Sequence, residues 1–119
     1  MARASSKPAP SHEQTVDRTL AALADPHRRR VVDLLRERPR PAGELADATG
    51  LSPPAMSRHL KTLRQSGLVE EARDEFDSRV RIYRLRREAM DDLKAWLAET
   101  EALWTRQLAA FKAHLKNRK

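Results

Sequence analysis

Residues 42–67 decide the fold, and they read AGELADATGLSPPAMSRHLKTLRQSG. A short helix is predicted over about 42–48, and Gly50 is suited to the left-handed backbone conformation that often follows a helix. A second helix is predicted over 53–66, because Ser52 is a favourable N-cap and a proline is favoured at the first helical position. Two short helices joined by a tight turn have the form of a helix-turn-helix.

The helix predicted over 53–66 separates apolar from polar side chains. At about 100° per residue, the residues that point inward are Met56, Leu60 and Leu63. The outward face and its flanks carry Pro54, Ser57, Arg58, Lys61, Thr62 and Gln65, without a carboxylate. Arginine and lysine bind guanine edges or phosphates, and hydroxyl groups bind either. This composition is typical of a helix that reads the major groove, although an ordinary solvated helix explains the pattern almost as well.

A β-hairpin is predicted directly after this motif, with strands over 68–73 and 79–85. Val80 and Ile82 alternate with Arg79 and Arg81, which indicates one half-buried face. A hairpin in this position is a wing, and its cationic candidates for phosphate contact are Arg73, Arg79 and Arg81. The turn over 74–78 is acidic and would be repelled by DNA, so the strand arginines are favoured over the tip.

Two helices are predicted before the motif. The first runs over about 11–24, where Ser11 and Gln14 form a capping box. The second begins after Asp25, an N-cap followed by a proline, and two later prolines end it by about residue 38. Residues 1–10 are expected to be a disordered basic arm, so one domain is predicted over 11–119.

A long helix is predicted over 87–116, with a length of about 40 Å at about 1.5 Å per residue. Its apolar stripe comprises Met90, Leu93, Leu97, Trp104, Leu108, Phe111 and Leu115, interrupted by Glu101. Part of this stripe is expected to pack on the first helix of the same chain. The remainder is too long for one small unit to cover, which favours pairing with a second copy. The predicted dimerisation residues are Leu20, Leu97, Trp104, Leu108 and Phe111.

Composition favours a nucleic-acid partner. The chain has 119 residues, a formal net charge of +7 and an isoelectric point near 10.5. A basic balance of this size attracts anions, and nucleic acid is favoured over a membrane surface. No window is apolar enough for a membrane span, and the first ten residues lack the features of a secretory signal, so cytoplasmic location is expected. The absence of cysteine excludes disulfides and thiolate chemistry.

Enzymatic and metal-binding chemistry find little support in the sequence. The three glycines lie too far apart for a phosphate-binding loop, and no serine has the setting of a nucleophile elbow. The four histidines, His12, His27, His59 and His114, are isolated in sequence, and His59 is expected at the edge of the core. We therefore expect no catalysis, no cofactor and no metal site, with a site shared across a dimer kept as a minor alternative.

Four stretches together resemble the ArsR/SmtB family of bacterial repressors: residues 22–35, 44–52, 56–69 and 81–85. The resemblance implies a winged helix-turn-helix homodimer, joined through its first and last helices, that blocks transcription at a palindromic operator. It also implies that the helix over 53–66 reads DNA. Carried over by position, the DNA-facing residues are Ser52, Pro54, Ala55, Ser57, Arg58, Lys61 and Thr62.

The chain departs from the metal-sensing relatives at both of their sensor sites. Where those relatives have a cysteine box, this chain has Pro41 and Gly43. Where they bind zinc on the last helix, it has Arg87, Ala89, Thr100 and Leu103. The turn over 75–78 also lacks the Gly-Arg pattern that is common in relatives. The sequence therefore resembles the metal-independent, often self-regulating branch of the family.

The expected fold is mainly α, with a small hairpin wing and a long C-terminal dimerisation helix. The expected function is sequence-specific repression by a homodimer on double-stranded DNA, with any inducer unknown. Two alternatives remain open: a ligand- or metal-responsive sensor of the same fold, and a protein-interaction module that uses the last helix and binds no DNA.

Overall fold

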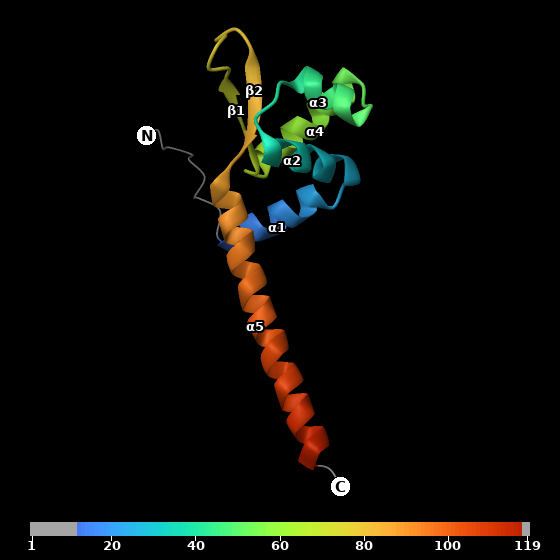
Figure 1. Cartoon of the computed structure of the whole chain (residues 1–119), viewed down its shortest axis with the longest axis vertical. Helices are drawn as coiled ribbons and strands as arrows, with labels where there is room; N and C mark the ends of the chain where they lie inside the picture. Colours follow the sequence, from blue (N-terminus) through green and yellow to red (C-terminus); the bar gives the residue numbers. More distant parts are fainter. Residues whose placement is uncertain (1–11, 118–119) are drawn as a thin grey trace, which may run out of the picture.

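The computed structural model describes residues 12–117, which form five helices and one antiparallel hairpin (Figure 1). The elements are α1 (His12–Leu23), α2 (Pro26–Glu37), α3 (Ala42–Thr49), α4 (Pro53–Gln65), β1 (Val69–Arg73), β2 (Arg81–Leu85) and α5 (Arg87–Asn117). The helix order and the hairpin agree with prediction, and the strands are shorter than predicted. The predicted basic arm and the Ser11 cap lie outside the described residues.

Local hydrogen bonds set the ends of the central helices. The Asp25 carboxylate accepts the backbone N–H of His27 at 2.7 Å and that of Arg28 at 3.2 Å, which caps α2. The Ser52 hydroxyl accepts the N–H of Ala55 at 3.3 Å and caps α4. Gly50 ends α3 with a φ of 72°, as predicted from its position.

The hydrophobic core lies among α2, α3, α4 and the base of the hairpin. The α4 side of this core consists of Met56, Leu60 and Leu63, as predicted. They pack against apolar residues of the neighbouring elements, among them Val31, Leu35, Leu45, Leu68 and Val69. Burial of one face of α4 leaves its opposite face at the surface of the molecule.

The hairpin is attached to the helices by a short backbone bridge. Arg40, between α2 and α3, exchanges both backbone hydrogen bonds with Tyr83, at 3.1 Å and 2.8 Å. Tyr83 and Leu85 pack against the core, together with buried Val69. This bridge fixes which face of β2 is turned toward the helices.

The prediction of one half-buried face in the hairpin is confirmed. Val80 and Ile82 are partly buried, whereas Arg79 and Arg81 are exposed, although Val80 and Arg79 precede β2. Because side chains alternate along a strand, Ile82 points away from the face that carries Tyr83 and Leu85.

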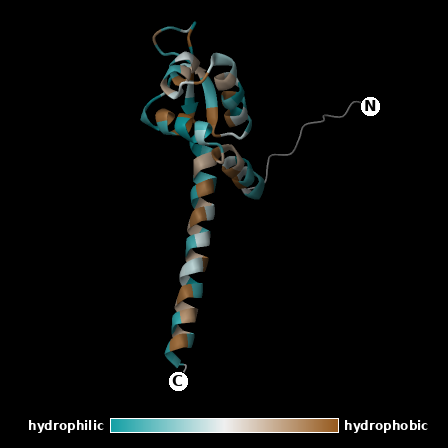
Figure 2. Ribbon diagram, turned by 90° about the vertical axis from the view of Figure 1, so that its right-hand side faces the viewer, coloured by the Kyte–Doolittle hydropathy of each residue, from teal (hydrophilic) through white to brown (hydrophobic). Residues whose placement is uncertain are grey.

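Helix α5 leaves the rest of the structure after its first turns (Figure 1). Ala89 and Leu93 are buried against the other elements, and α1 packs on this part of the helix. Every residue from 101 to 117 is exposed, including several large apolar ones (Figure 2). None of the described helices is long and apolar enough to cross a bilayer.

Candidate nucleic-acid interface

The candidate interface is the exposed face of α4, opposite the core. Arg58 and Lys61 are both exposed there, where the amphipathic pattern places them. Within residues 12–117, neither side chain has a hydrogen-bond or ion-pair partner. Two unpaired cations on one helix face are available to an anionic ligand without first breaking an internal contact.

The smaller predicted residues of α4 surround these cations. Ser52, Pro54 and Ser57 are exposed, whereas Ala55 and Thr62 are partly buried. The Ser52 hydroxyl already accepts the cap hydrogen bond, so its proton remains the group available for an outside acceptor. The seven predicted residues therefore lie at the N-cap of α4 or on the part of its surface that faces away from Met56.

Two hairpin arginines, Arg79 and Arg81, differ from Arg58 of α4 because carboxylates neutralise them. Arg79 donates to Asp77 through Nε at 3.1 Å and through Nη2 at 3.2 Å. These hydrogen bonds, with one from the Arg79 backbone, hold the pKa of Asp77 below its ordinary value. Nη1 of Arg81 lies 3.1 Å from Glu71. Arg79 and Arg81 are thus exposed but engaged with carboxylates of the hairpin. The third predicted cation of the wing, Arg73, is exposed and donates from Nη1 to the carbonyl of Ser78 at 3.1 Å.

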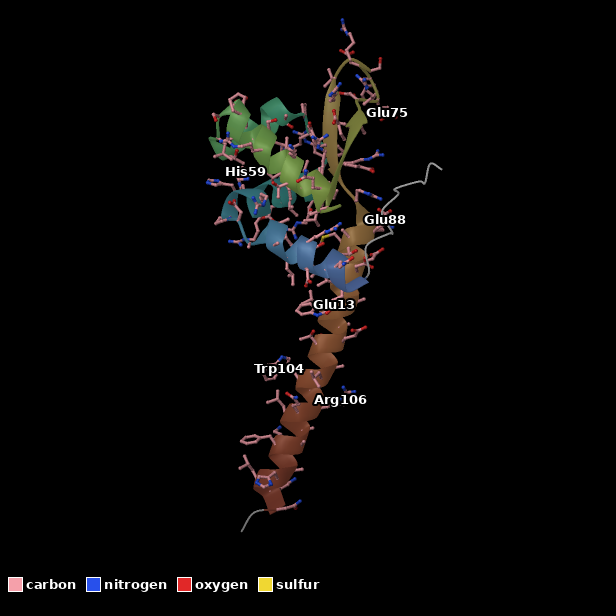
Figure 3. The ribbon with its side chains drawn as sticks, turned by 180° about the vertical axis from the view of Figure 1, so that it is seen from behind. Glu13, His59, Glu75, Glu88, Trp104 and Arg106 are labelled. Carbon is pink, nitrogen blue, oxygen red and sulfur yellow. The ribbon has the colours of Figure 1, made fainter. Side chains whose placement is uncertain are left out.

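The acidic hairpin tip projects farthest from the helices (Figure 3). Asp74 accepts the backbone N–H of Phe76 at 2.9 Å, and Glu75 lies in the same turn. The Phe76 side chain is exposed. A tip with this charge fits poorly against phosphates. Arg79, predicted in a strand, lies in this turn, because β2 begins at Arg81.

Two arginines of α2 are not DNA candidates because they cap α1. Arg28 donates from Nε to the carbonyl of Ala22 at 2.7 Å, and Arg29 donates to that of Leu23 at 2.8 Å. These carbonyls are at the end of α1, where no helical donor remains. The run of arginines over 28–30 looks like a basic patch in sequence, but two of its three members serve this capping role.

An ion-pair group links the end of α2 to α3. Arg38 donates to Glu44 at 2.6 Å and 3.2 Å, and Nη1 of Arg40 lies 3.8 Å from the same carboxylate. The hydrogen bond from Arg38 holds the pKa of Glu44 below its ordinary value and raises the pKa of Arg38. Sequence patterns did not predict this contact, because its partners belong to different elements.

The predicted dimerisation residues are exposed on α1 and α5. Leu20, Leu97, Trp104, Leu108 and Phe111 all present large apolar side chains to solvent, with Trp104 60% exposed. Figure 3 shows Trp104 on a part of α5 that no other element approaches. Nearer the core, Leu20 and Trp96 line a groove of about 360 Å³ with Val16 and an acidic rim. A row of this kind on a free helix suits contact with another protein surface.

The described histidines do not gather with acidic side chains into a metal centre. The rings of His27 and His59 lie 5.8 Å apart between α2 and α4, and His59 is partly buried, as predicted for the core edge. In the described part of the chain there is no group of three or more histidine or acidic side chains that could hold a metal ion.

Comparisons with known proteins agree with this geometry. A family of helix-turn-helix domains matches residues 23–72. The HTH-type transcriptional regulator Rv2034 of Mycobacterium tuberculosis is 37% identical over 95 residues, which are 80% of this chain and 83% of that protein. The transcriptional repressor SdpR of Bacillus subtilis is 36% identical over 52 residues, which are 44% of this chain and 58% of that protein.

Solved structures extend the match beyond the helix-turn-helix. An ArsR-like transcriptional regulator from Rhodococcus matches with a TM-score of 0.70 and 28% identity, over 83% of this chain and 91% of that one. The homodimeric winged helix-turn-helix DNA-binding domain of Mb0332 from Mycobacterium bovis matches with a TM-score of 0.57 and 27% identity, over 86% and 94%. The crystal structure of an ArsR family transcriptional regulator, RHA00566, matches with a TM-score of 0.67 and 32% identity, over 76% of this chain and 97% of that one. The chain therefore belongs to the ArsR family of winged helix-turn-helix transcriptional regulators.

Proposed function

We propose that the chain is a transcriptional repressor that binds a palindromic operator as a homodimer. The observation that carries the proposal is the pair of unpaired cations, Arg58 and Lys61, on the exposed face of the helix-turn-helix. The name of the repressor SdpR and the homodimeric state of the Mb0332 domain support repression and pairing. A bacterial regulator of this kind acts in the cytoplasm, where the chromosome lies.

The proposed contacts fall into two groups. On α4 and its cap, Ser52, Pro54, Ala55, Ser57, Arg58, Lys61 and Thr62 face the major groove. In the hairpin, Arg79 and Arg81 make weaker contacts with DNA phosphates, because each is already paired with a carboxylate. Two subunits then present their α4 helices about 34 Å apart, which matches successive major grooves on one side of B-DNA.

We further propose that binding needs no metal ion. The positions that align with the sensor sites of metal-sensing relatives carry side chains that are poor ligands, such as Pro41, Gly43 and Ala89. Among the described residues no alternative cluster replaces them. DNA binding should therefore be the same with zinc added and with a chelator present.

The function is tested by selecting bound duplexes from a random pool and by offering the DNA upstream of the chain's own gene. The selection should run at about 150 mM salt, where binding through charge alone is weak. The expected result is enrichment of an inverted repeat, with and without zinc. Recovery of no preferred sequence would contradict the proposal.

Arg58 is the residue that we expect to contribute most to binding the selected operator. The variant Arg58→Ala should bind it about 1–3 kcal/mol more weakly, because a bidentate or phosphate contact is lost. Fluorescence anisotropy measures the affinity, and sedimentation confirms that the dimer is intact. Arg106→Ala, on exposed α5, removes the same charge and should bind as the parent does. Equal affinity of parent and Arg58→Ala would refute this residue assignment.

A further inference from the structure

Glu71 lies on β1, where the hairpin meets the end of α4. Its Oε2 is 2.9 Å from Nη1 of Arg64 on α4, and its Oε1 is 3.1 Å from Nη1 of Arg81 on β2. The Glu71 side chain is 23% exposed, and those of Arg64 and Arg81 are 43% and 63% exposed. One carboxylate therefore connects the helix to the hairpin and neutralises part of the charge of two arginines.

Both arginines border the surface proposed to meet DNA. Arg64 follows Lys61 by three residues, so their side chains are neighbours on the surface of α4. Arg81 lies on the same face of the hairpin as Glu71, because Glu71 is paired with Tyr83 and side chains alternate along β2. Without the carboxylate, both guanidinium groups would be free to bind the phosphates of any sequence.

The contact is not needed to hold these elements together. Ion pairs that water reaches contribute little to stability. The end of α4 and the start of β1 are already joined through buried Leu68, whose N–H donates to the carbonyl of Leu63 at 3.2 Å. A role in DNA binding therefore accounts for this arrangement better than a role in folding.

We infer that Glu71 is a positioning residue that sets sequence specificity by keeping Arg64 and Arg81 from the phosphates of non-operator DNA. This inference rests on the proposed function. A complex with arbitrary DNA uses any register that brings cations to phosphates, whereas base contacts from α4 hold the operator complex in one register. Freed arginines therefore strengthen the non-operator complexes more than the operator complex.

Glu70 provides a matched control on the same strand. It is paired in the same way with two arginines, at 2.6 Å from Nε of Arg84 and 3.8 Å from Nε of Arg86. Its side chain points to the opposite face of the hairpin, away from Arg64 and Lys61. Glu70→Gln and Glu71→Gln change the net charge equally, so a difference between them reports the position of the charge.

The experiment measures anisotropy of the parent, Glu71→Gln and Glu70→Gln on the selected operator and on a scrambled duplex over a range of salt concentrations. Glu71→Gln should bind the scrambled duplex roughly three- to tenfold more tightly than the parent. The slope of log affinity against log salt should steepen by about 1–2, since each phosphate contact contributes about 0.9. The ratio of operator to scrambled affinity should fall, and Glu70→Gln should stay within about twofold of the parent.

A double variant links the effect to the named cations. Adding Arg81→Gln to Glu71→Gln should return the salt slope toward that of the parent, and thermal melts should show that all variants fold. Equal behaviour of Glu71→Gln and Glu70→Gln on the scrambled duplex would overturn the inference, because net charge alone would then explain it. A parent that prefers no sequence would instead contradict the proposed function, while the scrambled-duplex comparison would still decide the role of Glu71.

Discussion

At the scale of single residues, the cations of this protein differ in whether a carboxylate lies within reach. Arg58 and Lys61 have no partner within the described chain, whereas Arg79 and Arg81 each contact an acidic side chain. All four side chains carry the same formal charge, and only the folded structure shows which of them are paired with a carboxylate. The free cations of α4 are therefore the stronger candidates for contacts that hold the operator.

The lowered pKa of Asp25 predicts how the stability of the fold depends on pH. Partial desolvation raises this pKa, but the N–H groups of Arg28 and His27 and the nearby positive charges outweigh it, so the pKa lies below its ordinary 3.8. A carboxyl group with a lowered pKa stabilises the fold above its unfolded pKa, and this contribution is lost as pH falls through the folded value.

The variant Asp25→Asn should keep the helix-capping hydrogen bonds and remove the titrating charge. Asparagine caps helices about as well as aspartate but does not titrate in this range. The free energy of unfolding should therefore stay near that of the parent at neutral pH and fall less on acidification toward about pH 3. Urea unfolding at both pH values measures the difference. The same loss of stability with acid in variant and parent would show that Asp25 does not act in this way.

At the scale of elements, sequence predicted most of the helix ends because their causes are local. Ser52, Pro53 and Gly50 define the turn of the helix-turn-helix through capping and backbone conformation alone. The contact of Tyr83 and Leu85 with the core was not predictable in this way. It depends on the backbone bridge between Arg40 and Tyr83, which joins residues far apart in sequence.

The candidate site was predictable to a similar extent. Helical periodicity placed Arg58 and Lys61 outward, because burial of Met56 on the other side requires it. The ion pairs of Glu71 with Arg64 and Arg81 were not predicted, because they need the packing of α4 against the hairpin. Local patterns thus define which face is exposed, and tertiary contacts define which charges on it are free.

Replacing two glycines, Gly67 and Gly43, by alanine should change the free energy of unfolding in opposite directions. Gly67 has a φ of 83°, and Gly43 lies in α3 without a positive φ; an added Cβ meets nothing within 4 Å at either position. Gly67→Ala should lower the free energy of unfolding by about 1–2 kcal/mol, because L-residues are strained in this conformation. Gly43→Ala should raise it by up to about 1 kcal/mol, since alanine favours the helix. Urea unfolding measures both, and a shift of the same sign in both variants would contradict this explanation.

At the scale of the whole molecule, the main feature is a long helix whose apolar row, from residue 101 onward, is covered by none of the other described elements. The compact unit covers only the first turns of α5, and Figure 2 shows apolar residues along the rest. Phe111 and Leu108 are 59% and 58% exposed in the single chain. A second copy would cover this row and place a second α4 at a fixed distance from the first.

The variant Phe111→Glu should dissociate the dimer without unfolding the helix-turn-helix. A charge in the centre of an apolar contact is costly to bury, while the core around Leu63 is remote from this position. Sedimentation equilibrium should show a monomer, the backbone amide NMR signals of α1–α4 should keep their parental positions, and operator affinity should fall by at least tenfold. Ala109→Glu, away from the apolar row, should remain dimeric. A dimeric Phe111→Glu would show that the row is not the interface.

We expect two subunits to present their α4 helices to adjacent major grooves on one face of a duplex. Methylation interference on the selected operator reports major-groove contacts at single guanines. It should show two symmetric groups of interfering guanines, centred about 10 base pairs apart, with two chains bound per duplex. A single group of contacts, contacts confined to the minor groove, or one chain per duplex would contradict this expectation.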